Sequence, residues 1–113
     1  MKKIVEQGLL YDFYGELLTD NQKQIYEAAV YDDLSLTEIA DEHGISKQGV
    51  HDLIKRCTRT LEGYEDKLHM IRRFEAIKKK AEELERISGE CTDLGQLRDR
   101  TASIAGSIIE ELT

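Results

Sequence analysis

Hydrophobic residues recur at three- and four-residue spacing along most of the chain, and this pattern predicts helices. The first helix is expected at about residues 3–18, where a wide apolar stripe indicates burial. The second is expected at about residues 21–31, where Thr19 and Gln22 have the spacing of a capping box that would start it. No segment alternates like a half-buried strand, and proline is absent, so we expect an all-α fold. Five aromatic residues share these two apolar stripes with leucines and are predicted to be core rather than a base-stacking platform: Tyr11, Phe13, Tyr14, Tyr26 and Tyr31.

Two helices joined by a tight turn are predicted in the middle of the chain. Ser35 and Glu38 have the spacing of a capping box, which starts the first of these helices. Gly44 can adopt the positive φ that ends it, Ile45 is expected to fill the corner, and Ser46 can cap the second helix. The second helix would bury its apolar positions Val50, Leu53, Ile54 and Leu61. This arrangement is typical of a helix-turn-helix.

The other face of the second helix carries side chains that base edges and phosphates accept. Gln48 could pair with N6 and N7 of adenine, while Lys47 or Lys55 could reach guanine or a phosphate. The candidate DNA-binding residues are Ser46, Lys47, Gln48, His51, Asp52, Lys55, Arg56 and Arg59. The alternative is a solvated helix face, on which Arg56 and Arg59 pair with acids such as Glu62.

Residues 35–61 resemble the helix-turn-helix of the fourth region of bacterial sigma factors, in which LTEIADEHGIS would form the supporting helix and turn. From YDFYGELLTDNQKQIYEAA to LIKRCTRTLEGYEDKL, the chain resembles more closely the YlxM-like family of small helix-turn-helix proteins. That resemblance extends to about Leu68. It implies DNA binding and a regulatory role. It also implies an association with the signal recognition particle pathway, because the family's genes lie beside those for components of that particle.

Amphipathic periodicity continues beyond the motif. A long helix is predicted to reach Ile87, with its continuity with the preceding helix left open and Gly63 as the position of a kink. Ser88 and Gly89 are expected to end it. Either Thr92 or Asp93 would then cap a last helix.

A helical hairpin alone buries too little apolar surface to be stable in water. We therefore expect a helix-turn-helix domain at residues 1–66, with its motif at 35–61, and C-terminal amphipathic helices at residues 67–113 that form a homodimer. The alternative is that these helices fold back on the first domain and complete a monomeric core.

Charge opposes DNA binding over most of the chain, which has a formal net charge of −7. Residues 1–66 hold 7 basic and 14 acidic side chains, whereas residues 67–113 hold 9 of each. Residues 46–61, however, hold four basic side chains and one acidic side chain, a local charge of +3. We expect modest, strongly salt-dependent affinity for DNA. The alternative is an adaptor that uses its acidic surface to bind a protein or an RNA of the targeting machinery.

Residue types that carry catalysis or bind metals do not form a recognisable constellation. Cys57 and Cys91 are far apart and are expected to be reduced thiols, with Cys57 at the helix surface or partly buried. Neither the histidines nor the adjacent carboxylates have the spacing of a ligand set or of an acid–base pair. Acidic residues interrupt the first apolar stretch, which excludes a signal peptide or membrane span there. We expect a cytoplasmic protein that is not an enzyme and has no cofactor or metal.

Overall fold

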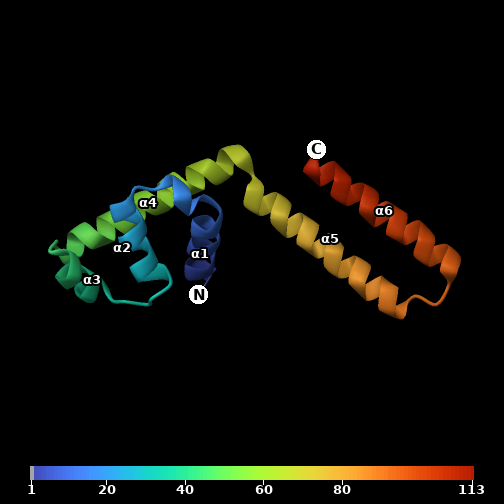
Figure 1. The fold of residues 1–113 in the computed structure, drawn as a ribbon, viewed down its shortest axis with the longest axis horizontal. Helices are drawn as coiled ribbons and strands as arrows, with labels where there is room; N and C mark the ends of the chain where they lie inside the picture. The colour runs from blue at the N-terminus through green and yellow to red at the C-terminus, as the bar shows by residue number, and fades with distance from the viewer. Residues whose placement is uncertain (1) are drawn as a thin grey trace. The chain divides into compact units, whose positions relative to one another are not determined.

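The computed structural model describes residues 2–113, which contain helices and turns and no strand (Figure 1). The predicted all-α fold is confirmed. The elements in chain order are α1 (Lys2–Tyr14), the 3-10 turn η1 (Gly15–Leu17), α2 (Asp20–Val30), α3 (Leu36–His43), α4 (Lys47–Leu68), α5 (Met70–Glu90) and α6 (Leu94–Leu112).

The chain divides into two compact units, Met1–His69 and Met70–Thr113. The first unit holds α1 to α4, and the second is an antiparallel hairpin of α5 and α6 (Figure 1). Between them His69 has a φ of 55°, and its backbone N–H donates to the carbonyl of Glu65 at 2.8 Å, which closes the last turn of α4. The two long helices are therefore separate. The break lies at His69, because α4 runs through Gly63 without interruption.

The predicted helix boundaries depend on caps, and most of them are confirmed. Thr19 and Ser35 each form a complete capping box at the start of α2 and α3. Ser46 caps α4, and Asp93 rather than Thr92 caps α6. Gly44 ends α3 with a φ of 65°. Two predicted ends differ: α1 stops at Tyr14, before η1, and α5 continues past Ser88 and Gly89 to Glu90.

In the first unit, the other three helices all pack on α4. Val50, Cys57 and Leu61 occupy the buried stripe of α4. Cys57 is only 1% exposed, so the prediction of a surface or partly buried thiol is wrong, and burial raises the pKa of this thiol. The residues that pack around this stripe and in the adjoining core are Leu10, Tyr14, Leu18, Ile25, Tyr26, Ala28, Ile39 and Ala40.

Several predicted core positions lie nearer the surface, among them Leu53 and Ile54 of α4, which are only half-buried. Tyr31 is 48% exposed, because it follows the end of α2, and its hydroxyl donates to the carboxylate of Asp12. Leu17, which belongs to the apolar stripe predicted at residues 3–18, is exposed because the 3-10 turn shifts it off the stripe of α1. Ile45 is also exposed, so it covers the corner between α3 and α4 only in part.

The same substitution at two glycines should change stability in opposite directions. Gly44→Ala places a Cβ at positive φ and is expected to lower the free energy of unfolding by about 1 kcal/mol. Gly63→Ala lies inside α4 with open space around its Cβ and should raise it by about 0.5–1 kcal/mol. Urea unfolding of both variants tests this, and a stabilised Gly44→Ala protein would contradict the turn geometry.

Candidate nucleic-acid interface

The two faces of α4 differ sharply in chemistry. Its apolar stripe is buried against the other helices of the first unit, which leaves the opposite face in contact with solvent. All eight predicted site residues are exposed: Ser46, Lys47, Gln48, His51, Asp52, Lys55, Arg56 and Arg59. With 100° between successive helical residues, Gln48, Lys55 and Arg59 lie close to one line along this face, and Asp52 lies beside them. The structure therefore places these four side chains together on one side of α4, and the other four predicted residues are exposed around them.

Several of these side chains are held by local hydrogen bonds. The Ser46 hydroxyl oxygen accepts from the Gly49 backbone N–H at 2.9 Å, which leaves its own O–H free to donate. Nε2 of Gln48 donates to Oδ1 of Asp52 at 2.9 Å, and Nδ1 of His51 lies 3.5 Å from the same oxygen.

The bond between Gln48 and Asp52 fixes the orientation of the amide. An ionised carboxylate can only accept, so the NH₂ group of Gln48 faces Asp52 and its Oε1 points elsewhere. The Gln48 amide and then His51 hold the pKa of the Asp52 carboxyl below its usual value. Gln48 thus keeps one N–H and its carbonyl oxygen for a ligand, which is the pair that adenine requires.

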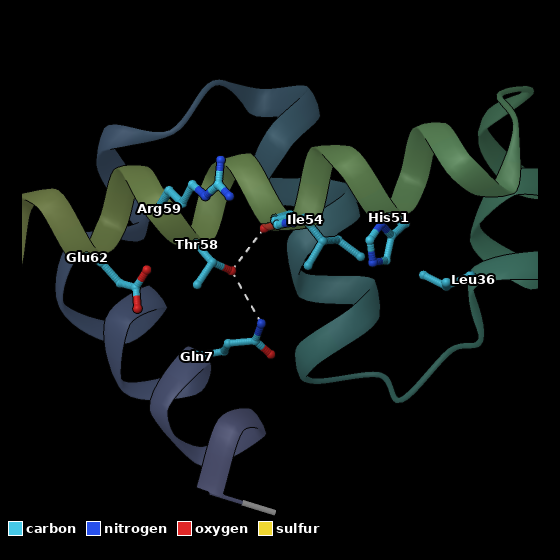
Figure 2. Close-up of a pocket in the computed structure, with 8 residues that line it drawn as sticks. Gln7, Leu36, His51, Ile54, Thr58, Arg59 and Glu62 are labelled. Carbon is cyan, nitrogen blue, oxygen red and sulfur yellow. Dashed lines mark hydrogen bonds between the residues drawn. The ribbon is translucent and has the colours of Figure 1, made fainter.

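A hollow of about 400 Å³ runs beside α4, between this helix, the middle of α1 and the start of α3 (Figure 2). Figure 2 shows Gln7 reaching toward Thr58 from α1, with Leu36 of α3 at the far end. The lining residues are Gln7, Leu36, His51, Ile54, Lys55, Thr58, Arg59 and Glu62. A second hollow shares Leu36 and His51 and adds Lys47 and Gln48. Five of the eight predicted residues therefore border one continuous side of α4.

Thr58 fixes the wall of this hollow. Its hydroxyl donates to the Ile54 carbonyl at 2.9 Å, so it must accept from the Tyr26 hydroxyl at 2.8 Å and from Nε2 of Gln7 at 3.3 Å. Tyr26 is fully buried, and this burial raises the pKa of its hydroxyl. Sequence periodicity could not predict that Gln7 and Thr58 line this hollow, because the hydrogen bond between them depends on how α1 packs against α4.

The basic side chains on α4 are not consumed by ion pairs within the described part of the chain. The predicted alternative, in which Arg56 and Arg59 pair with Glu62, is not seen there. Glu62 instead lines the hollow together with Arg59. The positive charge of this face is therefore available to an anionic partner.

The described residues were also compared with what a metal site or a membrane-spanning helix requires. Residues 2–113 contain no group of three or more His, Cys, Asp or Glu side chains placed to hold a metal ion. Over the same residues, every helix is too short or too polar to cross a membrane.

Residues 1–100 match a protein family described as "Putative helix-turn-helix protein, YlxM / p13 like". The chain belongs to this family. The resemblance predicted from the sequence is confirmed, and the match extends well past Leu68 into the second unit. The link to the signal recognition particle stays a prediction.

Relatives within the YlxM/p13-like family carry the family name UPF0122. The protein of Caldanaerobacter subterraneus subsp. tengcongensis is 47% identical over 76 residues, which cover 67% of this chain and 65% of the relative. That of Listeria innocua is 44% identical over 84 residues, covering 74% and 76%, and that of Streptococcus pyogenes serotype M5 is 50% identical over 70 residues, covering 62% of each. The matched segment thus spans less than two thirds of the length of the Caldanaerobacter and Streptococcus proteins.

Removal of the Gln48 amide should raise the pKa of Asp52 in this YlxM/p13-like protein. In Gln48→Ala the carboxylate loses its strongest hydrogen bond, so its NMR titration midpoint should move up toward the ordinary aspartate value. Because the folded-state pKa is lowered, the bond favours folding at neutral pH, and this contribution is lost as pH falls through that pKa. The control is Gln24→Ala, an exposed amide on α2. An Asp52 midpoint that is the same in all three proteins would show that the bond does not form.

Proposed function

We propose that this protein binds DNA through the exposed face of α4 and acts as a helix-turn-helix regulator. The observation that carries the proposal is the orientation of α4: its apolar stripe is buried, so all eight candidate residues face solvent together. Membership of a helix-turn-helix family supports the same role for this helix. The proposal places the protein in the cytoplasm, where bacterial DNA lies.

The dimensions of α4 suit the major groove of B-DNA. The groove is about 12 Å wide, and a helix with its side chains measures about 10–12 Å across. In a helix-turn-helix, residues near the start of the second helix reach the base edges. Lys47, Gln48 and His51 hold that place in α4. Gln48, oriented by Asp52, is the side chain that we expect to select a base.

Further along α4, the basic side chains suit a phosphate backbone. Lys55 and Arg59 border the hollow beside the helix, and a groove with cations at its edge can accept a sugar-phosphate strand. Glu62 and Asp52 lie on or near the same surface and would repel phosphate. The balance predicts modest affinity that falls steeply with salt. A homodimer forms part of this proposal, because two copies of α4 related by a two-fold axis would read a symmetric sequence.

The acidic balance of residues 1–66 favours one second candidate function. Twice as many acidic as basic side chains lie there, and most of the acids are outside residues 46–61. Such a surface suits an adaptor that docks a basic protein, or binds an RNA or protein component of the signal recognition particle, without binding DNA. This alternative needs the acids on α1, α2 and α3 rather than the face of α4.

Loss of three side chains from α4 separates the two functions. The variant Lys47→Ala/Gln48→Ala/Lys55→Ala is expected to weaken DNA binding at least about tenfold, because two phosphate or base contacts and one amide are removed. The slope of log K against log salt should become shallower by about two units. Fluorescence anisotropy with duplex DNA at several salt concentrations measures both quantities.

The matched control removes the same residue types from other surfaces. Gln24, Lys67 and Lys79 are all exposed and lie off the candidate face, so their triple alanine variant should bind nearly as the wild type does. Circular dichroism confirms folding of each variant. Equal DNA affinity for the α4 variant and the wild type would remove the regulator proposal and leave the adaptor.

A further inference from the structure

The hairpin of α5 and α6 leaves large apolar side chains in solvent. Only Ile87 and Ile104 are buried in this unit, where the two helices meet. Leu94 and Leu112 are each 68% exposed, and Met70, Phe74 and Ile109 are exposed as well. Exposed apolar side chains this large, gathered on one small unit, are typical of an interaction surface.

These side chains form one continuous face rather than scattered positions. Along α5, Met70, Phe74, Ile77, Ala81 and Leu84 follow the alternating four- and three-residue steps of a heptad seam. This seam lies about a quarter turn from the direction of Ile87, which points to α6. On α6, the line through Leu94 and Leu112 lies a similar quarter turn from Ile104. Both displacements run in the same rotational sense along the chain. Because α5 and α6 are antiparallel, the seam of α5 and the seam of α6 therefore lie on the same side of the hairpin.

Charge along α5 indicates what covers this face. Residues 70–80 contain five basic side chains and one acidic, a net charge of +4. Residues 81–90 contain four acidic and one basic, a net charge of −3. Four of these charges are paired inside the hairpin: Lys80 lies 3.5 Å from Glu111, Glu83 lies 3.8 Å from Arg100, and Arg86 lies 3.4 Å from Glu90. If a second α5 runs antiparallel to the first, the positive half of each helix lies beside the negative half of the other. A parallel pair would instead place like charges side by side.

Two residues beside the seam identify the pairing. Lys78 and Glu85 occupy the same heptad position, one repeat apart, and both are exposed. A two-fold axis near Ala81 would bring Lys78 of one copy to Glu85 of the other, twice per dimer. Ala81 is small and exposed, so two copies of α5 could approach closely at this point.

We infer that a second copy of this chain docks on the apolar face of the hairpin, with the two α5 helices antiparallel and Lys78 of each copy beside Glu85 of the other. The face is about 31 Å long and about 20 Å wide, so two copies bury roughly 1,200 Å² in total, which reaches the range of specific interfaces. This inference identifies the interface of the proposed homodimer, and it does not depend on nucleic-acid binding.

The oligomeric state of the full chain without nucleic acid is the test. Light scattering after size exclusion should give twice the chain mass of 13.0 kDa at micromolar concentration. Ala81→Glu buries a charge at the centre of the face and should raise the dimer Kd at least about 100-fold. Ser103→Glu, on the opposite side of α6, is the matched control and should remain a dimer. A monomeric wild type, or a dimeric Ala81→Glu protein, would overturn the inference. Either result would leave DNA binding by α4 untouched.

Charge reversal tests the antiparallel arrangement separately. Lys78→Glu and Glu85→Lys should each weaken the dimer, because each places like charges opposite one another. The double variant Lys78→Glu/Glu85→Lys restores opposite charges in an antiparallel pair and should return the Kd to near the wild-type value. Both residues are exposed, and circular dichroism checks that each variant folds. A double variant as weak as the single variants would exclude this pairing.

Discussion

The burial of one stripe of α4 is the constraint on which the first unit depends. Val50, Cys57 and Leu61 are almost completely removed from water, and α1, α2 and α3 all pack against this helix. Each of these burials contributes on the order of 1.5–3 kcal/mol, so rotation of α4 about its axis would cost most of the core. The polar face of α4 therefore stays exposed to solvent. The same packing that stabilises the fold therefore determines which side chains can meet a ligand, and it explains why Lys47, Gln48 and Lys55 are presented together.

Electrostatics then decides what kind of ligand that face suits. The acidic side chains of α1 to α3 belong to helices that pack on α4, and charges within a Debye length, about 8–10 Å, of its exposed face reduce attraction to phosphate. Residues 46–61 nevertheless keep a local positive charge, and Asp52 orients Gln48. A face of this kind depends more on fitted contacts than on net charge. Specific binding with weak non-specific binding is the expected result.

Local signals predicted the motif well, because each depends on a few neighbouring residues. The capping boxes at Thr19 and Ser35 and the left-handed Gly44 were all readable from spacing and residue type. The break at His69 was not, because a histidine at positive φ has no sequence signature comparable to that of glycine. Burial of Cys57 and the meeting of Gln7 with Thr58 also escaped prediction. Both depend on how helices distant in sequence pack, which periodicity alone does not specify.

The central claim is that the exposed face of α4 recognises DNA. The most direct measurement is selection by the purified protein from sheared genomic DNA and total cellular RNA together, at about 100 mM salt, where non-specific phosphate binding is already weakened. The account predicts enrichment of DNA fragments that share a short, symmetric sequence. Recovery of no DNA, or of RNA alone, would contradict it.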